Sequence, residues 1–119
     1  MKKGLRLRRR ADFQSAVKGH RFHSGRTLVG FAVANADSQF RVGVTVSRAI
    51  KNSVDRNRAR RRLREIARGT LLGIDSPLHQ VGIRYDVVLI ARPAALEVSF
   101  AELKAEASLA ALRLAKFKP

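Results

Sequence analysis

Arginine dominates the segment SVDRNRARRRLRE, residues 53–65, which holds six arginines in the nine positions from Arg56 to Arg64. Like charges at helical spacing repel one another, so this run lowers the stability of any helix that carries it. The guanidinium is a planar fork of donors that grips a phosphate through two hydrogen bonds or stacks on a base. These residue types therefore favour contact with nucleic acid over a purely solvated charged face.

Placed on a helix at about 100° per residue, residues 53–68 separate into two faces. The apolar face consists of Ala59, Leu63, Ile66 and Ala67. The cationic face consists of Asn57, Arg60, Arg61, Arg64 and Arg68. Beyond Asp55, Glu65 is the only acidic residue of the segment, so salt bridges within the helix leave most of the charge unneutralised. A basic helix of this kind suits a DNA major groove or the backbone of a structured RNA, and the residues alone leave both open.

Groups that would perform catalysis on the protein itself are not evident. Cysteine is absent, which excludes a disulfide framework and a thiolate metal site. The histidines, interpreted as surface residues of loops without an acidic partner at metal-ligand spacing, are His20, His23 and His79. The aspartates that form no obvious cluster for metal-assisted hydrolysis are Asp12, Asp37, Asp75 and Asp86. We therefore predict no catalytic residue and no metal ligand on this chain.

Composition indicates a folded, strongly basic domain. The chain has 119 residues, a net charge of +16 and a hydrophobic fraction of 45%, which is too apolar for a disordered basic tail. We predict a single domain over residues 1–119, with residues 1–10 as a basic arm. No apolar run is long enough for a spanning helix or a secretory signal, so we expect a cytoplasmic protein without a membrane partner.

Hydrophobic periodicity gives the order of the elements that position the arginines. The predicted elements are helix 11–19, strand 27–34, strand 40–47, helix 53–68, strand 86–92 and helix 100–117, and the pattern leaves room for one more short strand. We expect residues 20–26 to form a loop, and the first two strands to pair as an antiparallel hairpin around the polar turn NADSQ. Ser53 is the expected N-cap and Gly69 the expected stop of the arginine helix, while Ser99 and Glu102 form a capping box for the last helix. This order is typical of an α+β fold, with helices packed on a small sheet.

The block RVGVTVSRAIKNSVDRNRARRRLREIAR, residues 41–68, resembles the signature of the bacterial ribonuclease P protein subunit. The matching residues are Arg41, Gly43, Val46, Ser47, Val54, Arg56, Asn57, Arg58, Arg60, Arg61, Arg64 and Glu65. The segments LRLRRRADF and YDVVLIARP extend the resemblance over nearly the whole chain. Ala49, Lys51 and Ser53 depart from the usual Lys, Gly and Ala. The change at Lys51 questions the backbone conformation of its loop, because glycine tolerates positive φ and lysine does not.

The resemblance implies a small α/β sandwich, with a mixed sheet of about four strands, three helices and a left-handed β-α-β crossover through the arginine helix. It also implies a subunit of an endoribonuclease that removes the 5′ leader of precursor tRNA. The RNA subunit would carry out the hydrolysis with Mg²⁺, so the expected partners are that catalytic RNA and precursor tRNA, with no obligate protein partner. A structural RNA-binding protein, such as a ribosomal protein, is the alternative, and a DNA-binding domain is the third hypothesis.

Two binding surfaces follow from the resemblance. The residues expected to contact the RNA subunit are Arg48, Lys51, Asn52, Arg56, Asn57, Arg58, Arg60, Arg61, Arg64 and Arg68. A central cleft between the first helix and the sheet would take the single-stranded leader, and Phe13, Val17 and Phe31 map to it. Aromatic faces suit unstacked bases, although core packing accounts for Phe13 and Phe31 equally well. At Val17, apolar contact would replace the aromatic stacking usual in the family.

Overall fold

The computed structural model describes residues 6–7, 9–35, 40–73 and 75–117. Its elements are α1 (Arg10–Val17), β1 (His20–Ser24), β2 (Leu28–Asn35), β3 (Arg41–Val46), α2 (Ser53–Thr70), η2 (Pro77–Gln80), β4 (Arg84–Ala91), η3 (Pro93–Leu96) and α3 (Phe100–Lys116). Within the described residues, no helix combines the length and the apolar character needed to cross a bilayer.

The strands form one mixed sheet in the order β1-β2-β4-β3. β1 pairs with β2, and β2 with β4, in antiparallel orientation, whereas β3 runs parallel to β4. The predicted hairpin of strands 27–34 and 40–47, which correspond to β2 and β3, is therefore wrong, because β4 lies between them. All five residues from Tyr85 to Leu89 are buried, and four of them carry aliphatic or aromatic side chains. A strand covered on both faces takes a central place in its sheet.

The segment predicted as a loop forms β1, which pairs with β2 across the turn at residues 25–27. The strand contains a bulge between Arg21 and His23, and Phe22 is buried between them. Gly30 on β2 makes room for that ring, because a Cβ atom there would lie 2.5 Å from it. The strand is shaped by its partner, which explains why its polar sequence HRFHS gave no strand signal.

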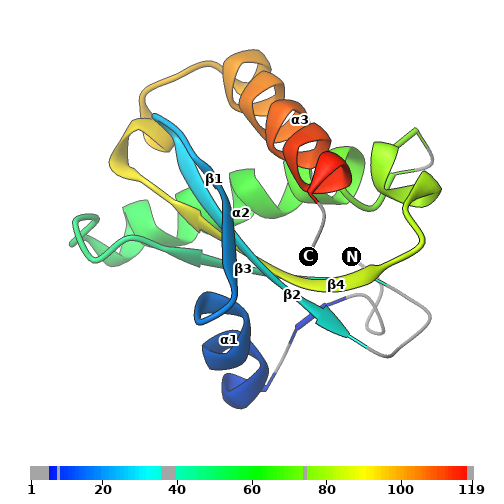
Figure 1. The fold of residues 1–119 in the computed structure, drawn as a ribbon. Helices are drawn as coiled ribbons and strands as arrows, with labels where there is room; N and C mark the ends of the chain where they lie inside the picture. Colours follow the sequence, from blue (N-terminus) through cyan, green and yellow to red (C-terminus); the bar gives the residue numbers. More distant parts are fainter. Residues whose placement is uncertain (1–5, 8, 36–39, 74, 118–119) are drawn as a thin grey trace.

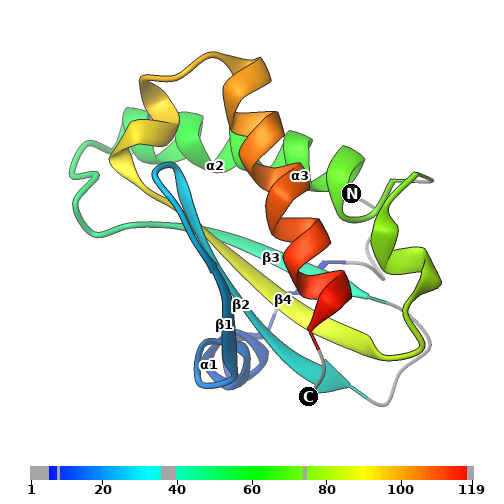
Figure 2. The ribbon, with the colours of Figure 1, turned by 45° about the horizontal axis from the view of Figure 1, so that its top comes forward.

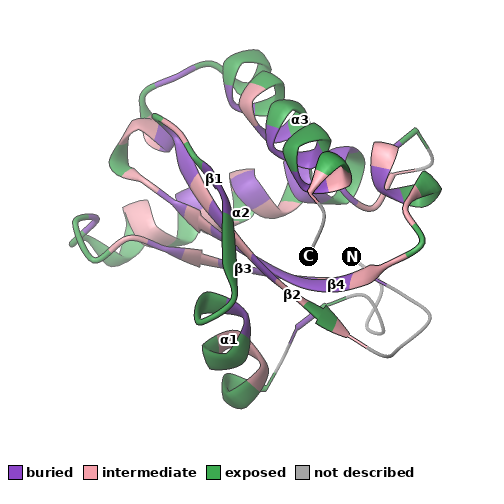
Figure 3. Cartoon of the chain, viewed as in Figure 1, coloured by how far each residue is buried: buried purple, intermediate pink, exposed green. Residues whose placement is uncertain are grey.

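Helices cover both faces of the sheet, with α2 and α3 on one face and α1 on the other (Figures 1 and 2). The main core lies under α2 and α3 and includes Val87 and Leu89 of β4, whereas Val88 faces the smaller cluster under α1. Figure 3 shows the buried residues along the sheet and along one side of α3. The expected four-stranded mixed sheet with three helices is confirmed. The handedness of the β3-α2-β4 connection stays a prediction.

The helix ends differ in part from the prediction. The N-cap of α2 is Asn52 rather than Ser53, since the Asn52 Oδ1 atom accepts hydrogen bonds from the amides of Val54 at 2.7 Å and Asp55 at 3.3 Å. Gly69 does not stop this helix, which continues to Thr70. The N-cap Ser99 of α3 is confirmed, because its hydroxyl accepts from the Glu102 amide at 3.1 Å.

Part of the predicted basic arm lies against the sheet. Arg6 forms a parallel bridge with Val42 of β3, and the Leu7 amide donates to the Val42 carbonyl at 3.1 Å. Leu7 is buried in the small cluster under α1, and Arg10 is the first residue of that helix. Residues 1–5 and 8, like residues 36–39 of the predicted turn, lie outside the described residues.

Candidate nucleic-acid interface

The two predicted faces of α2 are confirmed. Its apolar side docks on the sheet, and the buried residues there are Ala59, Leu63, Ile66, Ala67 and Thr70. Asn57, Arg61 and Arg68 are exposed on the other side, while Arg60 and Arg64 are half-buried. The burial of one side orients the helix, so the charge of the other side is presented as a fixed array.

Three arginines that flank this array are bound to backbone carbonyls. Arg56 donates from one nitrogen to the carbonyls of Ser47 at 3.0 Å and Ile50 at 2.9 Å, which holds the loop that precedes α2. Arg62 donates to the Val98 carbonyl at 2.9 Å, and Arg58 makes a longer contact of 3.5 Å with the Leu96 carbonyl. Arg56 and Arg58, both predicted RNA contacts, therefore also hold neighbouring segments in place.

The outward arginines have few partners. Arg60 donates to the Asn57 Oδ1 atom at 3.0 Å, and Arg68 is paired with Glu65 one turn earlier. Arg61 and Arg64 have no hydrogen bond or ion pair with any described residue. The cationic face thus keeps most of its charge available to an anion.

Arg64 is the most constrained of these residues. Its Nε atom is buried and has no hydrogen-bond partner among the described residues. Burial lowers the pKa of the Arg64 guanidinium, and the positive charges of Arg6 and Arg60 lower it further. A buried donor without an acceptor costs free energy, and so does crowding of like charges. A bound phosphate would relieve both costs.

A pocket of about 780 Å³ opens beside this arginine, at the edge of β3. Its lining residues are Arg6, Leu7, Phe13, Val44, Asn57, Arg60, Arg61 and Arg64. Four of these are arginines and none is acidic, while Phe13 and Leu7 add apolar surface. The pocket therefore offers both phosphate-binding and ring-binding groups within one space.

Sequence reasoning had not included Arg6 in this site. The residue was assigned to the basic arm of residues 1–10, and its place depends on the bridge with Val42 of β3, 36 positions later in the chain. A weak signal was present, since Arg6 and Leu7 alternate in the segment LRLRRR as a cation and an apolar residue do at a strand edge.

The loop before α2 presents the remaining predicted contacts. Arg48, Lys51 and Asn52 are exposed, although the side-chain oxygen of Asn52 is used in capping the helix. No described residue has a positive φ, so Lys51 fits its position without strain. The loop keeps its charge at the N-terminal end of the arginine array.

Of the three predicted cleft residues, Phe13 alone lines the arginine pocket. Phe13 is half-buried and its ring lies over Gly43, where a Cβ atom would approach it to 2.4 Å. Phe31 is half-buried on β2, in register with Arg21 and Val88, and Val17 is 39% exposed on α1. Phe13 therefore meets the arginine pocket, whereas neither Val17 nor Phe31 lines it. Their role in leader binding stays a prediction.

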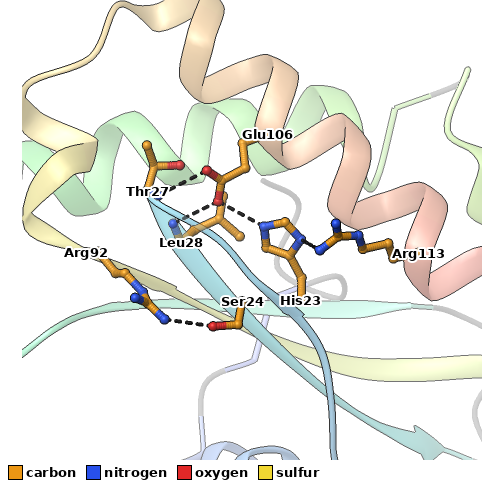
Figure 4. A network of polar contacts seen from close by, with 7 residues as sticks. All are labelled: His23, Ser24, Thr27, Leu28, Arg92, Glu106 and Arg113. Carbon is orange, nitrogen blue, oxygen red and sulfur yellow. Dashed lines mark hydrogen bonds and ion pairs between the residues drawn. The ribbon is translucent and has the colours of Figure 1, made fainter.

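His23 is not the surface residue that was predicted. It is buried, and its Nδ1 atom accepts a hydrogen bond from Arg113 at 3.1 Å, which leaves the ring proton on Nε2. That proton is donated to the Glu106 Oε2 atom at 2.9 Å (Figure 4). The same carboxylate accepts from the amides of Thr27 and Leu28 at 3.0 and 3.1 Å. This network joins the β1-β2 turn to α3, with partners 83 residues apart.

Comparison with known proteins agrees with this architecture. The family model for ribonuclease P matches residues 1–115. The ribonuclease P protein component of Streptococcus pneumoniae is 33% identical over 107 residues, which cover 87% of this chain and 79% of that protein.

Solved structures give the same result. The RNase P protein of Staphylococcus aureus is 28% identical with a TM-score of 0.71, covering 96% of this chain and 97% of that chain. The RNase P protein of Thermotoga maritima is 26% identical with a TM-score of 0.70, covering 96% and 98%. The chain therefore belongs to the family of ribonuclease P protein components, the protein part of an endoribonuclease complex that processes tRNA.

Proposed function

We propose that this protein binds the catalytic RNA of ribonuclease P through the cationic face of α2 and the loop before it. The same protein holds the 5′ leader of precursor tRNA on the side of the sheet covered by α1. The RNA subunit performs the phosphodiester hydrolysis, and the protein positions the substrate. The observation that carries this proposal is the pocket in which four arginines and Phe13 meet.

The pocket supports the proposal because it contains four arginines and no acidic residue. Its charges are not neutralised within the described residues, so the fold keeps them at a cost that an RNA phosphate offsets. Its position at the β3 edge lies between the helix that presents the arginines and the helix that presents Phe13. A strand of RNA that follows this edge would pass from one predicted surface to the other.

Mg²⁺ enters the proposal through the RNA. The described residues contain no group of three or more His, Cys, Asp or Glu side chains that could hold a metal ion. When bound, Mg²⁺ supplies charge stabilisation and an activated water for phosphodiester hydrolysis. The arginines of this chain bind and orient RNA phosphates around that centre. A cytoplasmic location follows as part of the same proposal, because the predicted partners are precursor tRNA and its processing RNA.

Reconstitution tests this function directly. The purified protein would be mixed with the ribonuclease P RNA of its own source and a precursor tRNA at low-millimolar Mg²⁺. Leader removal that requires both components, or is strongly accelerated by the protein, is the expected result. Tight RNA binding with no gain in cleavage would instead favour a structural RNA-binding protein that uses the same arginine face.

A further inference from the structure

A second aromatic site lies on the opposite face of the sheet from the predicted cleft. The rings of His20 and Phe117 are stacked, with centroids 3.7 Å apart and planes inclined by only 8°. Phe117 packs against the main core and follows α3, where its amide donates to the Leu114 carbonyl at 3.1 Å. The order from inside to outside is therefore core, Phe117, His20 and solvent.

His20 presents an open ring face. Phe117 covers one face of the imidazole, yet His20 is classed among the exposed residues of the chain. Its other face has no stacking partner among the described residues. An exposed aromatic face that is already held flat by a second ring is a preformed platform for stacking, with little side-chain entropy left to lose.

The backbone under this platform is also fixed. His20 is in register with Ala32 in the β1-β2 ladder. The preceding Gly19 packs so closely on β2 that a Cβ atom there would lie 2.4 Å from the Ala32 carbonyl oxygen. Both the strand and the stacked ring thus hold the imidazole in place.

The charge around the platform suits a nucleic acid. Lys18 and Arg21 flank His20 in the sequence, Lys116 precedes Phe117, and all three are exposed. No acidic residue occurs in residues 16–22 or 113–117. Stacking on aromatic rings inside a positively charged surface is the general mode of binding single-stranded nucleic acid.

Sheet geometry connects this platform to the predicted cleft. Arg21 is in register with Phe31 and shares its side of the sheet, whereas His20 lies on the other side with Ala32 of the main core. β1 is one of the two edge strands of the described sheet, at the opposite edge from β3. An RNA strand that leaves Phe31 past Arg21 therefore needs only to cross this edge to reach His20.

We propose that an unpaired nucleobase of the precursor leader, upstream of the nucleotides in the cleft, stacks on His20 against its Phe117 support. This inference rests on the proposed function, because it extends the path of the leader beyond Phe31. It assigns the platform to single-stranded RNA of any sequence, since every base offers a ring face.

The test uses the reconstituted holoenzyme and precursor tRNAs whose leaders are shortened step by step from the 5′ end. His20→Ala is expected to weaken binding of long-leader substrates by roughly fivefold, and to leave short-leader substrates unaffected. His20→Phe keeps a flat ring and should restore long-leader binding. His79→Ala, at an exposed histidine of η2, is the matched control. A 2-aminopurine placed at successive leader positions should lose fluorescence at one position in the wild type and regain it in His20→Ala.

The outcomes separate this inference from the proposed function. Equal losses with short and long leaders, no loss with either, or failure of His20→Phe to restore binding would each overturn the platform. If Phe31→Ala still discriminates leader-bearing from mature tRNA in that case, the cleft stands and only the platform is lost. If the wild-type holoenzyme does not bind precursor tRNA at all, the proposed function itself fails.

Discussion

Two regions of the molecule differ in how their buried charged groups are paired: the network around Glu106 and the arginine pocket around Arg64. Around Glu106, a partly buried carboxylate has a donor for each of its oxygens, and His23 is held by a partner at each ring nitrogen. Around Arg64, a buried donor has no acceptor among the described residues, and the neighbouring charges at Arg6 and Arg60 repel it.

We interpret this contrast as a difference between charge that stabilises the fold and charge that is available to a partner. The chain pairs polar groups over long sequence distances when they fasten β1 and β2 to α3. It leaves Arg61 and Arg64 at the β3 edge without a hydrogen bond or ion pair to any described residue, although three other arginines of the same helix donate to backbone carbonyls. Because an incoming anion would give the buried Arg64 donor an acceptor and offset the like charges beside it, we interpret the arginine cluster as a binding surface.

Among the substitutions considered, Glu106→Ala should have the largest effect on the free energy of unfolding, because it removes the acceptor at the centre of the His23 network. The substitution leaves the His23 ring proton and the amides of Thr27 and Leu28 without their acceptor, at a total cost of about 3 kcal/mol. Urea unfolding followed by circular dichroism measures this loss. Lys104→Ala, at an exposed position on the same helix, is the control and should change the free energy of unfolding by less than about 0.5 kcal/mol.

Acid provides a second measurement on the same carboxylate. Burial alone would raise the pKa of Glu106, but the hydrogen bonds from His23 and the amides of Thr27 and Leu28 outweigh it and hold the pKa below its ordinary value of 4.5. A folded-state pKa below the unfolded one stabilises the protein fully above pH 4.5 and loses that contribution as the pH falls through the lower value. Glu106→Gln should lack this component. An unchanged acid transition would mean that the carboxylate is not held as described.

The sequence predicted the arginine face of α2 better than the hydrogen-bond network around Glu106. The faces of α2 follow from spacings of three and four residues, and β4 follows from a continuous apolar run, so both are local signals. The hydrogen bond between His23 and Glu106 joins positions 83 residues apart, and no local sequence pattern predicts it. β1 was missed for the same reason, because Phe22 is buried against a strand partner that lacks a side chain at Gly30.

Two further differences show how local rules compete. The predicted hairpin assumed that neighbouring strands pair, but β4 pairs with both β2 and β3 and separates them. Asn52 and Ser53 are both good N-cap residues, and only the path of the preceding loop, held by Arg56, selects Asn52. The joining of Phe13 to the arginine pocket likewise depends on where α1 lies on the finished sheet.

Replacing Arg60 and Arg61 together by alanine tests the arginine face of α2. Two lost phosphate contacts should weaken binding to the catalytic RNA by roughly thirtyfold, about 2 kcal/mol, and should reduce the slope of log affinity against log salt by about 1.4–1.8. Filter binding across a salt series measures both quantities. Circular dichroism should show an intact fold, since neither residue is among those that α2 buries against the sheet. Unchanged affinity, or an unfolded protein, would contradict the assignment.

Phe31→Ala tests whether the face of the sheet near Arg21 receives the leader. Loss of one stacking surface should weaken binding of leader-bearing precursor tRNA by roughly fivefold, about 1 kcal/mol, and leave mature tRNA unaffected. The ratio of the two affinities is the relevant measurement, because any loss of stability in the half-buried ring would affect both substrates alike. Equal losses would assign Phe31 to the core rather than to the leader.

Arg64→Gln should have the smallest effect of these substitutions. It is also the most informative, because it should raise the stability of the free protein and lower its affinity for RNA. Without RNA, removal of the like-charge pairs with Arg60 and Arg68 at helical spacing is worth a few tenths of a kcal/mol each, which raises the unfolding midpoint by about 1–2 °C. With RNA, the variant should bind more weakly than the wild type. Added sulfate should stabilise the wild type more than the variant in thermal melts, because the anion relieves the same crowding. A variant that loses stability with and without anions would show that Arg64 belongs to the fold, as Glu106 does, and the contrast between the two regions would disappear.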